Sequence, residues 1–178
     1  MTRSSRLTGV LFGSLILHAM PCPAQVSTGD APARSISLMI GSLSYDRGDD
    51  SSLPMVAVLT DWRLSNHVAA QTAMSHAWRP AGERSALALT TATAGVLAEL
   101  DLRYVRPYTG IAAGLFGRFG PPGDDRFVRT TIAFPAGLRA IITRRILARA
   151  EVRFRFDEHQ DGGAAADAEL SLGLGWRF

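Results

Sequence analysis

Hydrophobic and polar residues alternate with a period of two along most of the chain. The last segment, residues 167–178, places apolar side chains at every second position, with small or charged residues between them. Residues 146–156 follow the same rule, and their polar positions hold Arg and Glu. Because successive side chains of a strand point to opposite faces, each segment predicts a strand with one apolar and one polar face.

Six earlier segments show the same alternation more weakly. They are residues 34–45, 54–64, 68–78, 86–99, 107–118 and 127–139. The total is eight candidate strands of about ten to twelve residues, the length that a tilted strand needs to cross a bilayer. The connections alternate between long ones rich in Gly, Pro and Asp and short ones. This pattern predicts an all-β fold, an eight-stranded antiparallel up-and-down transmembrane β-barrel.

The alternation does not by itself decide which face points outward, because a soluble barrel buries its apolar face and a membrane barrel exposes it to lipid. Aromatic residues near the strand ends favour the membrane barrel, since such residues gather at bilayer interfaces. The interface aromatics predicted on this basis are Tyr45, Trp62, Trp78, Tyr108, Phe127 and Phe156. A soluble periplasmic β-domain is the alternative.

In a membrane barrel of eight strands, the polar face lines a lumen just wide enough to be filled by side chains. Buried carboxylates and guanidiniums are normally paired, so the charged residues of that face predict an ion-pair network inside the barrel. The predicted network consists of Asp61, Arg63, Glu99, Arg129, Arg139, Arg149, Glu151, Arg153 and Arg155.

The N-terminal residues have the layout of a secretory signal peptide. Arg3 and Arg6 precede an apolar run, and small residues lie before a cleavage position after Ala24. The run is shorter than the ~20 residues that a spanning helix needs. We therefore expect a signal peptide at residues 1–24, a short periplasmic segment at 25–33 and the barrel at 34–178.

Composition narrows the classes of function. The 178 residues carry a formal net charge of +3, all their basic residues apart from His are Arg, and no basic run marks a nucleic-acid surface. The only cysteine, Cys22, lies in the expected signal peptide, so the exported chain would have no thiol for a disulfide, a nucleophile or a metal site.

Two motifs carry a resemblance to a known family. The C-terminal Leu-Gly-Leu-Gly-Trp-Arg-Phe (residues 172–178) and the Pro-Tyr-Thr-Gly-Ile-Ala-Ala-Gly stretch (residues 107–114) resemble the small outer-membrane β-barrel proteins of the OmpA/OmpX-like superfamily. The resemblance implies a bacterial outer-membrane location, export by the general secretory pathway, and contact with chaperones and the barrel-insertion machinery. The terminal signal read by that machinery would consist of Leu170, Leu172, Leu174, Trp176 and Phe178.

No pattern of catalytic or metal-binding residues stands out. His67 lies in an expected tight turn, His76 is expected to face outward at the upper interface, and His159 lies in an acidic loop without a neighbouring serine. The acidic clusters at 46–50 and 157–161 match no dense calcium loop. We therefore expect no enzyme, no cofactor and a monomer that contacts outer-membrane lipids and lipopolysaccharide, with a structural or surface-interaction role. A rim-sited lipid-modifying hydrolase using His159 and a narrow pore are the alternatives.

Overall fold

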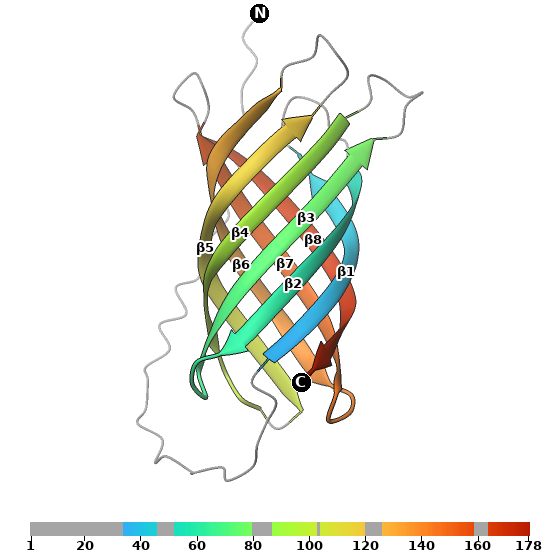
Figure 1. Cartoon of the computed structure of the whole chain (residues 1–178), viewed down its shortest axis with the longest axis vertical. Helices are drawn as coiled ribbons and strands as arrows, with labels where there is room; N and C mark the ends of the chain where they lie inside the picture. Colours follow the sequence, from blue (N-terminus) through green and yellow to red (C-terminus); the bar gives the residue numbers. More distant parts are fainter. Residues whose placement is uncertain (1–33, 46–51, 80–86, 103, 120–125, 159–163) are drawn as a thin grey trace, which may run out of the picture.

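Eight antiparallel strands form a closed barrel. The computed structural model describes residues 34–45, 52–79, 87–102, 104–119, 126–158 and 164–178. The strands are β1 (Arg34–Ser44), β2 (Ser52–Arg63), β3 (Val68–Arg79), β4 (Leu87–Glu99), β5 (Val105–Phe119), β6 (Phe127–Ile141), β7 (Ile146–Glu158) and β8 (Ala164–Arg177). Each strand pairs with its neighbours in the chain, and β1 also pairs with β8 (Figure 1). The predicted fold is confirmed, and the strand ends differ from the predicted ones by only a few residues.

The two ends of the barrel differ. At one end, which we call the turn end, tight connections join β2 to β3, β4 to β5 and β6 to β7, and the described chain begins and ends there (Figure 1). Backbone bonds close these turns: the amide of Leu64 donates to Val68 O at 2.9 Å, and that of Ile142 donates to Ile146 O at 3.0 Å. The remaining connections lie at the opposite, loop end. Residues 46–51, 80–86, 120–125 and 159–163 fall outside the described residues, and so do the expected signal peptide, His159 and most of the acidic clusters.

The outside of the barrel is apolar. Exposed large hydrophobic side chains occupy alternate positions on most strands, and Leu38, Ile40 and Leu172 are each at least 60% exposed, whereas the outward positions of β4 hold mainly Ala and Thr. Water would strongly disfavour such a surface, whereas the hydrocarbon of a bilayer accommodates it. The residues proposed as an insertion signal belong to this outer face of β8, where Leu170, Leu172, Leu174, Trp176 and Phe178 are all exposed. Within the described residues, no helix is long and apolar enough to span a membrane.

Three of the six aromatic positions differ from the sequence prediction. Trp62, Trp78 and Phe156 do point outward near the ends of their strands. Tyr45 and Tyr108 are buried inside the lumen, and Phe127 packs against the apolar lumen cluster that contains Tyr45. The reason is their register: Tyr45 shares the inward positions of β1 with Met39 and Leu43, and Tyr108 pairs with Glu99 of β4, which also points inward.

Candidate functional site: the charged lumen

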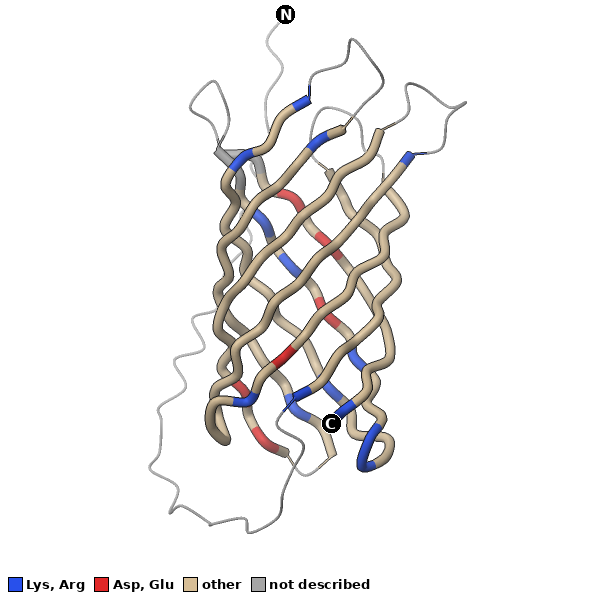
Figure 2. The backbone as a smooth tube through the Cα atoms, in the orientation of Figure 1, with Lys and Arg blue, Asp and Glu red and all other residues tan. Residues whose placement is uncertain are grey.

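The charges inside the barrel come mainly from β7 and β8, where acidic and basic residues follow one another along the far wall of the barrel (Figure 2). Arg149, Glu151, Arg153 and Arg155 occupy alternate positions of β7, so all four side chains point inward and all are nearly inaccessible. The register places Arg153 opposite Glu169 and Arg155 opposite Asp167. One polar face of one hairpin therefore supplies most of the lumen charges.

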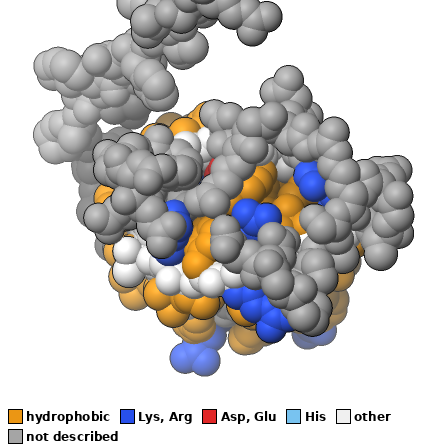
Figure 3. All heavy atoms as spheres, turned by 90° about the horizontal axis from the view of Figure 1, so that it is seen from above, with side chains coloured by type: hydrophobic (Ala, Val, Ile, Leu, Met, Phe, Trp, Pro, Cys, Tyr) orange, Lys and Arg blue, Asp and Glu red, His pale blue; other side chains and the backbone are white. Residues whose placement is uncertain are grey.

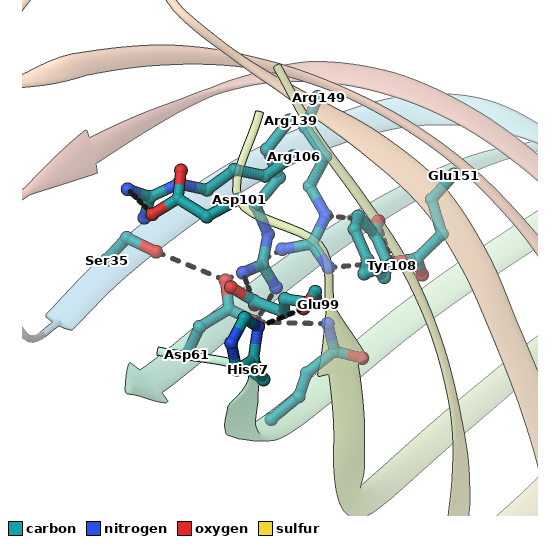
Figure 4. A network of polar contacts seen from close by, with 11 residues as sticks. Ser35, Asp61, His67, Glu99, Asp101, Arg106, Tyr108, Arg139, Arg149 and Glu151 are labelled. Atoms are coloured by element: carbon teal, nitrogen blue, oxygen red, sulfur yellow. Dashed lines mark hydrogen bonds and ion pairs between the residues drawn. The ribbon is translucent and has the colours of Figure 1, made fainter. Parts of the chain in front are cut away.

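Asp61 is the centre of the network at the turn end. Its Oδ1 accepts hydrogen bonds from Gln71 Nε2 at 3.1 Å and Arg139 Nη2 at 2.8 Å. Its Oδ2 accepts from Ser35 Oγ at 3.1 Å and Arg149 Nη1 at 2.8 Å. Arg139 also forms an ion pair with Glu99 (Figure 4). Five strands, β1, β2, β3, β6 and β7, are thereby joined at a single carboxylate.

Tyr108 and Glu151 extend the network toward the middle of the barrel. The Tyr108 hydroxyl donates to Glu151 Oε2 at 2.7 Å and accepts from Arg149 Nε at 2.8 Å (Figure 4). Glu151 also accepts from Arg149 Nη2 and from Arg153 Nη2, each at 2.7 Å. The tyrosine fits here because Gly137 lies opposite it, and a Cβ at Gly137 would stand 2.5 Å from the Tyr108 hydroxyl oxygen.

Arg155 anchors the part of the network nearest the loop end. Its guanidinium pairs with Asp167 Oδ2 at 2.8 Å and Glu169 Oε1 at 2.9 Å, and it also donates to the Thr91 hydroxyl. Ser75 Oγ donates to the same Glu169 oxygen at 3.2 Å. Arg153 reaches across the lumen to Gln71 Oε1 at 3.0 Å and so belongs to the Asp61 group, and it lies opposite Glu169 in the β7–β8 ladder. The lumen therefore holds two neighbouring groups of ion pairs, one around Asp61 and Glu151 and one around Arg155.

An apolar cluster covers the network on its loop side. It consists of Leu43, Tyr45, Leu53, Met55, Ala77, Leu87, Leu89 and Phe116, with Phe127 packed against it. The fully buried Phe116 ring lies 4.2 Å from the Arg155 guanidinium carbon, so the cluster rests directly on the last ion pair. Seen from the loop end, hydrophobic and basic side chains of the described residues are visible (Figure 3). The lumen is occupied by a polar layer and an apolar layer in series.

The charges of the network nearly balance. Four guanidiniums, those of Arg139, Arg149, Arg153 and Arg155, face five carboxylates, those of Asp61, Glu99, Glu151, Asp167 and Glu169. Buried charges are tolerated when each is paired and hydrogen-bonded, and every one of these nine residues has an ionic partner. Such a constellation can brace the barrel and exclude solutes, since each charge already has an ionic partner; among the described residues, the buried Nε groups of Arg139, Arg153 and Arg155 have no hydrogen-bond partner.

Two residues of the sequence-predicted set lie outside this network. Arg63 lies half-exposed at the turn-end mouth, with no ion pair to any described residue. Arg129 lies near the loop end, with its guanidinium carbon 4.2 Å from the centre of the Phe127 ring.

Four residues of the network were not predicted as its members from the sequence: Tyr108, Gln71, Asp167 and Glu169. Asp167 and Glu169 share the alternation of the last strand, which was the available signal; nothing in the sequence reveals that Tyr108 lies between two charges.

No catalytic arrangement emerges from the described histidines. His76 is on the outer face, where its Nδ1 lies 3.0 Å from Thr90 Oγ1 and its ring stacks beside Trp78. His67 is exposed in the turn before β3, with Nδ1 3.4 Å from Glu99 O (Figure 4). Among the described residues no group of three or more His, Cys, Asp or Glu side chains could hold a metal ion.

Comparison with known proteins supports the fold through structure alone. No family model matches the chain, and no curated protein matches its sequence. Neisserial surface protein A has a similar solved structure, with a TM-score of 0.66 and 14% identity over 82% of this chain and 96% of that one. OprG from Pseudomonas aeruginosa gives a TM-score of 0.59 and 10% identity over 84% and 98%.

Ail of Yersinia pestis is also similar, with a TM-score of 0.54 and 18% identity over 82% of this chain and 96% of that one. These similarities extend over nearly the full length of each known barrel. Together with the apolar outer face and the closed antiparallel sheet, they show that the chain has the fold of the small outer-membrane β-barrels.

Proposed function

We propose that the protein is an integral outer-membrane β-barrel with a closed lumen and a structural or surface-interaction role. The observation that carries the proposal is the filled interior: two neighbouring groups of ion pairs, one around Asp61 and Glu151 and one around Arg155, covered by the Phe116 cluster. An open pore needs a water-filled passage, whereas these side chains satisfy one another across the lumen. The protein therefore acts through its surface and not as a solute channel.

Conductance in planar lipid bilayers tests this proposal. The wild-type protein is expected to insert without stable current steps. Combining F116A with R155A removes the contact between the apolar layer and the ion pairs, and brief openings are expected. The matched control combines F119A with R145A, which changes an exposed aromatic of the same strand and an arginine of a turn. Steady current through the wild type would refute the closed lumen.

A surface-interaction role has support at the loop end. Four arginines, Arg79, Arg118, Arg126 and Arg129, lie at the loop-end termini of β3, β5 and β6 or just beyond them. Ail, which has a similar fold, has been solved in complex with the heparin analogue sucrose octasulfate. Arginine suits such anions because its planar guanidinium binds sulfate and phosphate groups in a bidentate manner. We propose that these arginines contact anionic groups at the cell surface, including the phosphates of lipopolysaccharide.

Binding of the folded protein to immobilised heparin tests this role at increasing salt concentration. Replacing Arg79 and Arg126 by Gln is expected to lower the salt needed for elution. The control, R144Q with R145Q, removes the same charge at the turn end and is expected to elute as the wild type does. If both variants eluted at equally lowered salt concentrations, binding to heparin would depend on the net charge of the protein alone.

The location and the route of export are parts of the same proposal. The apolar outer face requires a bilayer, and residues 1–24 have the layout of a signal for the general secretory pathway. After passage with periplasmic chaperones, the insertion machinery would read the terminal signal, which consists of Leu170, Leu172, Leu174, Trp176 and Phe178.

The protein is proposed to act as a monomer and not as an enzyme. The hydrolase alternative depends on His159, and an unchanged lipid A mass spectrum in an H159A strain would remove it.

A further inference from the structure

Arginines without partners gather at the turn-end mouth of the barrel. Arg63 ends β2, Arg177 ends β8, and Arg34 begins β1 between them, at the seam where the barrel closes. Basic residues lie at both ends of the backbone, and one group of them surrounds this end (Figure 2). Neither an ion pair nor a side-chain hydrogen bond joins any of these three guanidiniums to another described residue.

The carboxylates around the mouth are already engaged. Asp61 holds Arg139 and Arg149, and Glu99 holds Arg139. Asp101 accepts hydrogen bonds from Arg106 Nε at 3.0 Å and from Arg106 Nη2 at 2.9 Å, which together form a bidentate ion pair (Figure 4). Asp101 also attracts Arg177 electrostatically, but no carboxylate of the described part of the chain forms an ion pair with Arg34, Arg63 or Arg177.

These residues surround a hollow rather than project freely into water. Its lining consists of Arg34, Arg63 and Arg177, the paired residues Asp61, Glu99, Arg106 and Arg139, and also Ser35, Ala69, Ile141 and Leu147. Arg177 is only 9% exposed. Its backbone is fixed, because its amide donates to Arg145 O at 2.7 Å and its neighbour Phe178 exchanges hydrogen bonds with Arg34 at 3.0 and 3.2 Å. A nearly buried cation beside other cations is costly without an anion.

We propose that this hollow is a phosphate-binding site at the turn end, formed by Arg63 and Arg177 with Arg34 at its rim. Two guanidiniums on β2 and β8, with β1 between them, can approach a tetrahedral anion from two sides, and a phosphate group offers enough acceptor oxygens for both. Five arginines and two carboxylates line the hollow, and this excess of positive charge suits a phosphate better than a single carboxylate. The phosphate can belong to a soluble anion or to the headgroup of an inner-leaflet phospholipid, and the site uses the same contacts for both.

The experiment measures binding to the full-length folded protein in maltoside micelles, which contain no phosphate. Isothermal titration uses inorganic phosphate in one arm and a short-chain phosphatidylglycerol in the other. The arginine Nε resonances of Arg63 and Arg177 are followed in parallel by NMR. Saturable binding with shifts at both resonances is expected in at least one arm. Binding of phosphate identifies a soluble source, and binding of the lipid alone identifies the headgroup.

A charge-matched pair of variants makes the result specific. R63Q with R177Q is expected to weaken binding by about tenfold or more, because both charge-assisted contacts are lost. R144Q with R145Q removes two exposed arginines of the same end and is expected to bind as the wild type does. Both variants should fold, which heat-modifiable gel migration checks, because none of the substituted side chains takes part in an ion pair with a described residue. An absence of binding in both arms, or equal loss in both variants, would overturn the proposal.

Discussion

Replacing Asp61 with Asn tests how much the lumen network stabilises the barrel. Asp61 receives four hydrogen bonds from Ser35, Gln71, Arg139 and Arg149 and is only 4% exposed. An asparagine of the same shape offers one acceptor oxygen, and its amide N–H group would face donors on the other side. Ser35 can rotate its hydroxyl, but the guanidiniums of Arg139 and Arg149 have no acceptor to offer.

The expected loss in the free energy of unfolding follows from removing one charged partner from a buried ionic cluster. Removing one member of a buried pair costs about 3–5 kcal/mol because a buried charge is left uncompensated. Arg139 retains Glu99 and Arg149 retains Glu151, which places the expected loss near the lower value. We therefore expect D61N to lower the free energy of unfolding by about 3 kcal/mol.

Equilibrium urea titration of folding into phospholipid vesicles measures this loss, with tryptophan fluorescence and heat-modifiable gel migration as two independent signals. The matched control is D101N at the same end of the barrel. Asp101 pairs with Arg106 but is 40% exposed, so its substitution is expected to cost no more than about 1 kcal/mol. The reasoning is refuted if D61N costs no more than D101N, because the lumen would then be as well hydrated as the rim.

Three further predictions concern packing, the lipid face and assembly. G137A is expected to lower the free energy of unfolding by about 1–3 kcal/mol in the same titration, since its Cβ would clash with Ala150 O and the Tyr108 hydroxyl, whereas in G117A the close contacts are with the exposed side chain of Phe119. L172R places a charge on the lipid face opposite Ile40 and is expected to lower the free energy of unfolding by about 2–4 kcal/mol. L64R, beyond the end of β2, is expected to lower it by about 0–1 kcal/mol. Equal losses in the two variants would contradict the membrane orientation. F178A is expected to lower the amount of heat-modifiable protein in outer-membrane fractions while leaving refolding into vesicles unchanged, and a normal amount would remove Phe178 from the insertion signal.

The strands and their faces could be predicted from the sequence because both follow from one local rule. Asp61, Glu99 and Arg149 occupy positions whose parity alone places them on the polar side of their strands. The contacts could not be predicted in the same way. The Asp61–Arg149 pair joins residues 88 positions apart, and such pairs depend on how the strands are staggered when β1 meets β8.

Tyr45 and Tyr108 show a second limit of the sequence pattern. A tyrosine near a strand end suits a bilayer interface and also suits a lumen that offers a partner for its hydroxyl. Tyr108 points into the lumen because Gly137 leaves space for its ring and because Arg149 and Glu151 form hydrogen bonds with its hydroxyl. The apolar cluster around Phe116 was also absent from the sequence reasoning, which expected charges throughout the lumen.

The most direct test of the membrane-barrel account is the quenching of tryptophan fluorescence by brominated phospholipids. All three tryptophans, Trp62, Trp78 and Trp176, point outward near the strand ends, at the two interfaces. Three variants that each retain one tryptophan, with Phe at the other two positions, are reconstituted into bilayers with bromines at different depths. The account predicts that lipid quenches each tryptophan, most strongly when the bromines lie near the headgroups. Tryptophans that bromolipids leave unquenched while aqueous iodide quenches them would contradict it.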